Sequence, residues 1–506
     1  IMRIITAVQA SELDQKSMED YGVSGIDLMG AAGKEIAENV KTIVAEIHDP
    51  RIIIICGKGN NGGDGFATAA WLDKYSVQIF TSVDKELIKS DSAHFHNVCV
   101  EKDITIHYSK NPPIDFECDL VIDALLGTGC KGELKDDILK WTMWMNALHC
   151  IVLAVDCPTG INGNNGMAAS HSVKAGKTIT MGFPKLGLIM KQGQDHTGKI
   201  KTVDIGFPNI IDDLSGLKWS RFEESDISGL LSKIETDTYK HQQGKVLLIA
   251  GSKGMTGAAV LSTFGSLRSG AGLTITCAPE SIEDIYEKTI IEGMTIGCPD
   301  DGNGFLISDS FEIIKDRIQW CDAIVIGPGL GRSPNTIKMV KKVVLNANKP
   351  LIIDADALCF FQGKLENFNK IKTPFIITPH EGEFCNLLKI TREEYIKSFP
   401  DIVEKFMDNF SGVLVLKNAP TITYYNDKAI VNSSGNPGMA TAGMGDILAG
   451  ILGTFVSQGM DCFQAAQAGV YIHGLAADNK VIEKGQRGLI ASDLLDELPK
   501  VLHAFE

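Results

Sequence analysis

A glycine-rich loop near the N-terminus has the residue types and spacing of a phosphate-binding turn. Residues 57–65 follow a β-branched run, precede a helix-forming stretch and satisfy the pattern G-x-G-x-x-G. Such a loop presents backbone N–H groups at a helix N-terminus, where they can bind phosphate. Asn60, Asn61 and Asp64 add oxygen-bearing side chains that a hydride-transfer site does not need. A tight glycine turn is the alternative, but the strand before it and the helix after it favour a nucleotide site.

Aspartates at further strand ends extend this chemistry. Asp123 precedes Gly127–Gly129, and Asp156 precedes Pro158 and Thr159. The carboxyl ends of parallel strands meet at one crevice, so these oxygen groups are expected to converge with those of the glycine loop. Oxygen atoms alone suit a hard cation together with an acid or base. Each aspartate taken singly is equally explained as a helix cap or turn former.

The strongest motif of the C-terminal half is residues 438–446, directly before the apolar helix expected at 447–452. Consecutive backbone N–H groups of residues 442–445 and the helix dipole form an anion hole for a transferring phosphoryl group. Asp446 is placed to take a proton from a substrate hydroxyl. Its alternative role is to cap orphan N–H groups of the helix.

Other segments of this half also follow apolar strands and are expected at the same face. They are residues 251–257, 327–331, 354–356, 378–383 and 416–421. Within them, His380 is either a ligand contact or a satisfied turn histidine.

Two further patterns resemble a nucleotide-binding loop and a metal site, but each lacks a residue that such a site requires. Residues 193–199 have Walker A spacing, but Ile200 stands where a metal-binding hydroxyl is required. His94, His96 and Cys99 form a local trio with no fourth metal ligand.

Composition limits the possible partners. The 63 acidic residues exceed the 48 basic ones, giving a net charge of −15, which excludes a broadly basic surface for nucleic acid or anionic membranes. Twelve cysteines without a C-x-x-C motif favour a reduced, cytoplasmic setting. Aliphatic runs have the length of strands, and no signal peptide is recognised, so a protein with no membrane segment is expected.

Alternation of strands and helices predicts two α/β domains. Continuous apolar runs separated by helix-like sequence indicate parallel sheets that are covered on both faces. The expected strands are 51–56, 76–81, 119–123, 150–155, 245–249, 323–326, 351–353, 375–377 and 412–416. The alternation of strands and helices stops near residue 208. The predicted domains are therefore 1–215, with a Rossmann-like parallel sheet, and 222–506.

Four spaced motifs in the first domain resemble NAD(P)H-hydrate epimerase: residues 28–33, 59–65, 123–129 and 155–160. The resemblance implies a site for the hydrated nicotinamide nucleotide and a potassium site, with Asp156 as substrate contact and acid/base. The implied substrate contacts are Asn60, Asn61, Gly62, Gly63, Asp64, Gly127, Thr128, Gly129, Cys130, Lys131, Gly132, Glu133 and Asp156. The implied potassium ligands are Asn61, Asp123 and Thr159. Gly30 and Ala31 depart from the usual bulky polar pair.

The second domain resembles the ribokinase-like superfamily, and within it the NAD(P)H-hydrate dehydratases. The resemblance rests on residues 255–259, 327–331, 354–358, 378–380 and 443–446. The implied contacts to the hydrated nucleotide are Ala258, Gly329, His380 and Asp446. The implied contacts to the phosphate donor are Lys417, Asn418, Ala419, Pro420, Thr421 and Gly445. Met444 replaces a usual threonine, and Tyr239–Lys240 replaces a usual His-Lys pair.

Together the two resemblances imply a bifunctional repair enzyme for hydrated NADH and NADPH. One domain would interconvert the R and S epimers with potassium in its site. The other would dehydrate the S epimer through a phosphate ester, with magnesium and ADP or ATP as donor, releasing AMP and phosphate if ADP is used. A homo-oligomer is expected, without nucleic acid or membrane partners. The alternative is a ribokinase-type metabolite kinase fused to a non-catalytic Rossmann-like scaffold.

Overall fold

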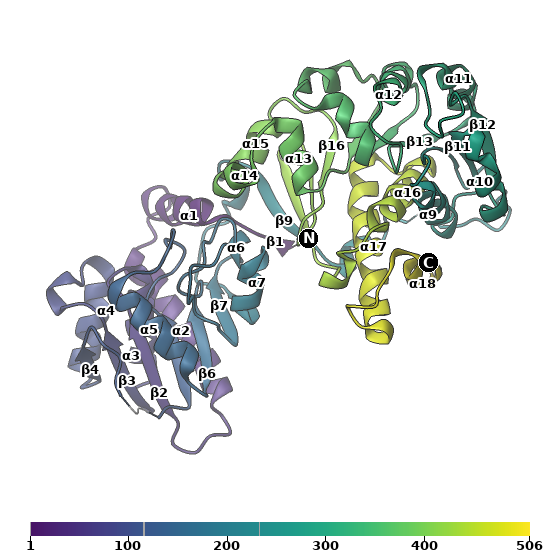
Figure 1. Ribbon diagram of the computed structural model, residues 1–506. Coiled ribbons are helices and arrows are strands. Elements are labelled where there is room, and N and C mark those ends of the chain that lie inside the picture. The colour runs from purple at the N-terminus through teal and green to yellow at the C-terminus, as the bar shows by residue number, and fades with distance from the viewer. Residues whose placement is uncertain (1, 115–116, 232) are drawn as a thin grey trace. The chain divides into compact units, whose positions relative to one another are not determined.

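The chain folds into two compact units (Figure 1). The computed structural model describes residues 2–114, 117–231 and 233–506. One unit comprises residues 3–219, and the other comprises residues 220–506 together with Met2. The division falls between residues 215 and 222, where the sequence loses its strand–helix alternation.

The N-terminal unit is built on a sheet of seven strands in the order β4-β3-β2-β5-β6-β7-β8, with every neighbouring pair parallel. The strands are β2 (Arg51–Cys56), β3 (Ser76–Thr81), β4 (Thr105–Tyr108), β5 (Leu120–Ala124), β6 (Ile151–Val155), β7 (Lys177–Met181) and β8 (Lys199–Val203). Four of these were predicted. The other three lie at or next to the sheet edges, where β4 and β8 are only half-buried and their sequences lack continuous apolar runs.

Helices cover both faces of this sheet. They are α1 (Ala7–Glu19), α2 (Gly25–Ile43), α3 (Asn60–Trp71), α4 (Ser90–Glu101), α5 (Asp136–Ala147), α6 (Leu186–Ile189) and α7 (Gln192–Thr197). On one face, α2, α3 and α4 pack their apolar side chains against alternate strand residues such as Ile52 and Ile54. On the other face, Trp141 and Met145 of α5 pack against Ile53 and Ile55. Successive residues of a strand face opposite sides of the sheet, and both sides are covered by helices here. This explains why β2 contains an unbroken run of isoleucines.

The C-terminal unit contains an eleven-stranded mixed sheet in the order β1-β9-β18-β17-β16-β15-β14-β13-β10-β11-β12. The pairs from β12 to β16 are parallel, whereas β16–β17 and β17–β18 are antiparallel. The strands are β1 (Met2–Arg3), β9 (Lys218–Phe222), β10 (Lys245–Ile249), β11 (Leu273–Pro279), β12 (Met294–Cys298), β13 (Ala323–Ile326), β14 (Leu351–Ile353), β15 (Phe375–Ile377), β16 (Val413–Leu416), β17 (Ile422–Tyr425) and β18 (Lys428–Asn432).

The helices of this unit enclose the central strands. They are α8 (Glu224–Ile227), α9 (Thr256–Arg268), α10 (Glu283–Thr289), α11 (Phe311–Trp320), α12 (Pro334–Asn346), α13 (Glu381–Leu388), α14 (Arg392–Ser398), α15 (Asp401–Met407), α16 (Met444–Ser457), α17 (Cys462–Lys484) and α18 (Ala491–His503). One sheet face packs against α16, α17 and α18 through residues such as Val246 and Leu248. Leu247 and Ile249 point to the opposite face and are equally buried, so both faces are covered. Within the described ranges, no helix is both long enough and apolar enough to cross a membrane.

Candidate active sites

The N-terminal unit contains a cavity of about 480 Å³ at the carboxyl ends of β2, β5 and β6. The strand order reverses between β2 and β5, and ligands of open parallel sheets bind beside such a reversal. The predicted residues that line the cavity are Asn60, Asn61, Asp64, Gly127, Thr128, Gly129 and Asp156. The cavity therefore brings together residues of three loops that are far apart in the chain.

The remaining predicted substrate contacts do not line this cavity in the described part of the chain. They are Gly62, Gly63, Cys130, Lys131, Gly132 and Glu133. A Cβ atom at Gly62 would collide with the carbonyl group of Gly57, so this glycine shapes the loop. Cys130 is buried in a small apolar cluster, and Glu133 accepts a 2.9 Å hydrogen bond from the amide of Ser170.

A buried lysine holds the predicted catalytic residue Asp156. Lys185 Nζ lies 2.5 Å from Asp156 Oδ1, and the lysine side chain is only 4% exposed. The same ammonium donates to Thr180 Oγ1 at 3.1 Å and to the carbonyl oxygen of Met181 at 3.0 Å, which uses all three of its protons. Asp156 itself has φ of 62°, a rare conformation for a residue with a side chain. The fold thus fixes one carboxylate oxygen of Asp156 on Lys185 at the cavity wall.

Two further aspartates share the cavity with this ion pair. Asp14 of α1 is half-buried, and burial together with the negative charge of Asp156 raises its pKa to about 6, against the opposing effect of Lys185. Burial, Asp156 and Asp14 raise the pKa of Asp64 well above its ordinary value. The sequence patterns did not identify Asp14 or Lys185, because Asp14 lies within a helix and Lys185 follows a strand that lacks a glycine motif.

Of the predicted potassium ligands, Asn61 lines the cavity, whereas Asp123 and Thr159 do not. Asp123 and Thr159 are fully buried; Asp123 Oδ1 accepts from the Thr159 hydroxyl at 2.7 Å, and Oδ2 accepts from its amide at 2.8 Å. Burial raises the pKa of Asp123 to about 6, although these hydrogen bonds oppose the shift. Asn61 Nδ2 is buried with no acceptor among the described residues. Because the two amide atoms of asparagine are interchangeable by a flip, Asn61 can present oxygen instead, and the donor set fits a hard cation.

The C-terminal unit has a run of free backbone amides at the start of α16. From residue 442 onward, the first amide that donates a backbone hydrogen bond is that of Ile447, and its acceptor is the carbonyl oxygen of Gly443. The amides of residues 442–446 donate none to described residues. Gly443, with φ of 92°, turns the chain into the helix. Orphan amides at a helix N-terminus attract anions, so the geometry agrees with the predicted phosphoryl site.

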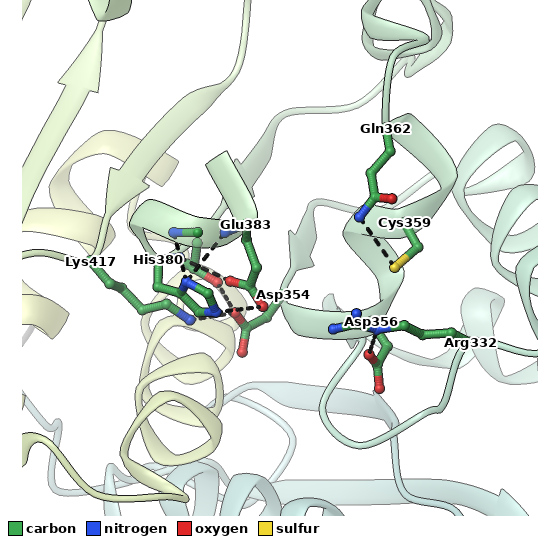
Figure 2. Close-up of polar contacts among 10 residues, drawn as sticks. Arg332, Asp354, Asp356, Cys359, Gln362, His380, Glu383 and Lys417 are labelled. Carbon is green, nitrogen blue, oxygen red and sulfur yellow. Dashed lines mark hydrogen bonds and ion pairs between the residues drawn. The ribbon is translucent and has the colours of Figure 1, made fainter. Parts of the chain in front are cut away.

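A lysine–aspartate pair, Lys417 and Asp354 (Figure 2), lies close to Gly445 at the start of α16. Lys417 Nζ is 2.8 Å from Asp354 Oδ1, which also accepts from Thr378 Oγ1 at 2.6 Å. A Cβ atom at Gly445 would lie 3.2 Å from Lys417 Nζ, so glycine permits this close approach. Burial opposes the charge of Lys417, but Asp354, Glu383 and Asp446 together raise its pKa.

Asp446 has no ion-pair partner in the described ranges, in contrast to Asp354. Burial raises the pKa of Asp446 to about 7, and the charges of Asp354 and Asp356 add to the shift, while Lys417 opposes it. A carboxyl group that titrates near neutral pH is suited to accept a proton from a substrate.

His380 is the N-cap of α13, and Figure 2 shows its ring turned back onto that helix. Its Nδ1 accepts from the amides of Gly382 at 3.0 Å and Glu383 at 3.2 Å. The ring proton therefore lies on Nε2, which is 3.6 Å from Glu383 Oε1. The side chain is 59% exposed, so Nε2–H remains available to a ligand. Both of the predicted roles of His380, turn residue and ligand contact, are compatible with this geometry.

Loops after β10 and β13 bring the other predicted substrate contacts together. A Cβ atom at Gly329 would lie 2.7 Å from the Cβ atom of Ala258, so the two residues are in contact. The Gly329 loop is anchored by Asp356, which accepts from the amide of Gly331 at 2.9 Å and pairs with Arg332 at 2.7 Å (Figure 2). The strand order reverses between β10 and β13, as it does at the N-terminal cavity.

The segment predicted to hold the phosphate donor follows β16. Its residues other than Lys417 are Asn418, Ala419, Pro420 and Thr421. Asn418 Oδ1 accepts from the amide of Ala419 at 2.9 Å, and its buried Nδ2 has no acceptor among the described residues.

His473 of α17 was missed by sequence patterns. It is buried, and burial and the charge of Lys417 lower its pKa to about 4.

The structure shows the surroundings of residues that depart from the family patterns and of the motifs that the sequence analysis rejected. Met444 is buried in the apolar core, so its side chain does not occupy the anion site. Tyr239 is largely exposed. Residues 193–197 lie in α7, where Thr197 Oγ1 bonds to the carbonyl of Gly193. In the described part of the chain, no cluster of three His, Cys, Asp or Glu residues is arranged for a metal.

Comparison with known proteins agrees with this division. Residues 25–187 match the family described as YjeF-related protein N-terminus, and residues 246–500 match NAD(P)H-hydrate dehydratase. Parallel sheets with glycine loops and aspartates at their carboxyl edges define the chain as a fusion of two α/β domains of these classes. The chain belongs to the family of bifunctional NAD(P)H-hydrate repair enzymes.

Relatives of this family match the chain over its whole length. The bifunctional NAD(P)H-hydrate repair enzyme Nnr of Moorella thermoacetica is 33% identical, over 100% of this chain and 97% of the relative. The enzyme of the same name from Coxiella burnetii is 33% identical, over 97% of both chains. A crystal structure of ADP/ATP-dependent NAD(P)H-hydrate dehydratase from Bacillus subtilis, co-crystallised with ATP/Mg²⁺, is 28% identical. It covers 56% of this chain and 98% of that chain, with a TM-score of 0.49.

Proposed function

We propose that this chain repairs hydrated NADH and NADPH in two steps. The N-terminal unit interconverts the R and S epimers of the hydrated nicotinamide ring. The C-terminal unit dehydrates the S epimer with ADP or ATP as phosphate donor. The observation that carries this proposal is the presence of two separate strand-edge sites in one chain, each with an aspartate beside glycine loops.

In the C-terminal unit, Asp446 accepts the proton of the substrate hydroxyl as its oxygen attacks phosphorus. The free amides of residues 442–446 hold the transferring phosphoryl group. The donor's terminal anhydride bond breaks, which leaves AMP if ADP is the donor. Departure of the phosphate from the ring, followed by loss of a proton from the neighbouring ring carbon, then restores the double bond of the reduced cofactor. Magnesium enters with the nucleotide, whose AMP part lies along residues 417–421.

In the N-terminal unit, Asp156 is the acid/base, and the nucleotide lies along residues 60–64 and 127–129. Asn61, Asp123 and Thr159 would hold potassium, which would supply positive charge to the site. Replacing potassium by a bulky organic cation is expected to slow epimerisation and leave dehydration unchanged. Equal epimerisation rates in both salts would contradict the potassium assignment.

The decisive experiment gives the purified full-length protein a mixture of both NADH hydrates with ADP or ATP. Recovery of NADH absorbance from the whole mixture is expected. Recovery of the S fraction alone would refute the epimerase assignment. A stable phosphorylated product without NADH would favour a metabolite kinase instead.

Size-exclusion chromatography with light scattering tests the expected homo-oligomer.

A further inference from the structure

Epimerisation of a hydrated nicotinamide inverts one ring carbon that carries a hydroxyl group. Inversion through cleavage of the carbon–oxygen bond needs a proton delivered to the leaving hydroxyl. It also needs a base that takes a proton from the water molecule adding to the opposite face. The ring nitrogen supplies the electron pair when the hydroxyl leaves and recovers it when water adds, so no outside oxidant or reductant takes part. The site must therefore hold one protonated and one ionised group together.

The cavity contains such a pair on different elements. Asp156 follows β6, and its carboxyl group accepts a hydrogen bond from the ammonium of Lys185. Asp14 extends from α1 into the same cavity and receives no hydrogen bond on its carboxyl group from described residues. All three protons of Lys185 go to Asp156, Thr180 and Met181, so Lys185 does not pair directly with Asp14.

We propose that Asp14 and Asp156 form the acid–base pair of the epimerase. Asp14 protonates the leaving hydroxyl on one ring face, and Asp156 accepts the proton of the water that adds to the other. One turnover leaves the pair with its single proton on Asp156, which is the form needed for the reverse inversion. Proton exchange with solvent resets the pair. This inference rests on the proposed epimerase function and adds a second catalytic residue to it.

The surroundings of Asp14 support this assignment. The charged and titratable groups that share the cavity are Lys58, Asp64 of α3, Asp91 of α4, Asp156 and Lys185. Burial and Asp156 raise the pKa of Asp14 to about 6, so the group exchanges its proton near neutral pH. Burial and the charges of Asp156 and Asp14 raise the pKa of Asp64 as well, and its place in the glycine loop suits it to contact the nucleotide.

The test follows epimer interconversion by chromatography without ADP or ATP, so that dehydration is silent. Asp14→Asn is expected to lower kcat by about 100-fold or more, and Asp14→Glu to recover part of the loss. Asp20→Asn, an exposed aspartate just after the same helix, is the matched control and should be unchanged. A cooperative thermal unfolding transition of each variant shows that the N-terminal unit is folded, because dehydration of the S epimer reports only on the C-terminal unit. Equal rates for Asp14→Asn and wild type would overturn the inference.

Two further readouts separate this inference from the general function. Wild-type protein that fails to interconvert the epimers would refute the proposed epimerase, whatever Asp14 does. In oxygen-18 water, each inversion should place one labelled oxygen on the ring, and inversion without label would overturn carbon–oxygen cleavage. Asp64→Asn should raise KM more than it lowers kcat. A larger loss of kcat for Asp64→Asn than for Asp14→Asn would assign the acid to Asp64 and overturn the proposal.

Discussion

Both units contain a buried lysine next to an aspartate, but the lysine has a different partner in each. In the N-terminal cavity, Lys185 binds Asp156, the candidate catalytic residue itself. In the C-terminal site, Lys417 binds Asp354, while Asp446 stays unpaired in the described ranges. The same two residue types therefore give two electrostatic arrangements.

The difference teaches how position decides the function of a carboxylate. In the N-terminal cavity the lysine contacts the candidate catalytic carboxylate directly, and in our proposal Asp14 is the second member of the acid–base pair. In the C-terminal site the lysine binds Asp354 instead, and burial raises the pKa of Asp446 to about 7, so Asp446 can alternate between its two forms near neutral pH. One arrangement suits a fixed charge, and the other suits a proton acceptor that must be regenerated in every cycle.

The largest expected effect is that of Asp446→Asn on dehydration. Loss of the proton acceptor should lower kcat by about 10²–10⁴-fold, because general base catalysis contributes this much. Recovery of NADH from the S epimer measures the change. The exposed Asp496→Asn is the control. Epimerisation should be unaffected in both variants, and persistent dehydration by Asp446→Asn would exclude this residue as the base.

The next-largest expected effect concerns Lys185, the lysine that binds Asp156. Lys185→Met leaves Asp156 buried without its cation, which should slow epimerisation by about 100-fold and lower the free energy of unfolding by about 3–5 kcal/mol. Rate assays and denaturant unfolding measure both changes, with exposed Lys199→Met as the control. If dehydration rather than epimerisation were lost, the assignment of Lys185 to the first reaction would be wrong.

A smaller effect concerns the pH dependence of dehydration. Asp446 acts as a base only when ionised, so kcat/KM should rise as the pH increases through about 7. Asp354→Asn removes a negative charge that raises this pKa, so the rise should move down by about one pH unit. Asp356→Asn, which removes a weaker influence, should move it less. An upward shift in Asp354→Asn would contradict the electrostatic arrangement.

The smallest effect is a gain in stability. Burial raises the pKa of Asp14 in the folded state to about 6, above the ordinary value for an aspartate, so the folded state binds a proton more tightly than the unfolded state. Its contribution is fully present at low pH and declines as the pH rises from about 4 to 6. Asp14→Asn should therefore stabilise the protein above pH 6 by about 2 kcal/mol and have little effect at pH 4. Thermal unfolding at both pH values measures this, and equal effects would contradict it.

The sequence predicted the central architecture better than the periphery. Buried strands such as β2 and β13 are continuous apolar runs, which predict parallel strands directly. Strands nearer the sheet edges, such as β8 and β9, mix polar and apolar residues and were not recognised. The segment near residue 220 that lacks periodicity contains β9, which lies between β1 and β18 and mixes polar with apolar residues.

The sites follow a similar division. Asp156 and Asp446 were found because each stands at a strand or helix boundary beside glycine or proline. Asp14 and His473 lie within helices, where neighbouring residues give no signal of a cavity. Their importance depends on burial and on charges from distant segments, which only the folded chain defines.

The anion site at the start of α16 consists of backbone amides, and this determines which changes it can tolerate during evolution. Substitutions at positions 442 and 444 replace side chains but keep the amides, which is how methionine can stand at 444 without removing a donor. Proline removes a donor wherever it is introduced, and a side chain at Gly443 strains a φ of 92°. Natural variation at this site should therefore be broad in side-chain type but closed to changes that alter the chain path.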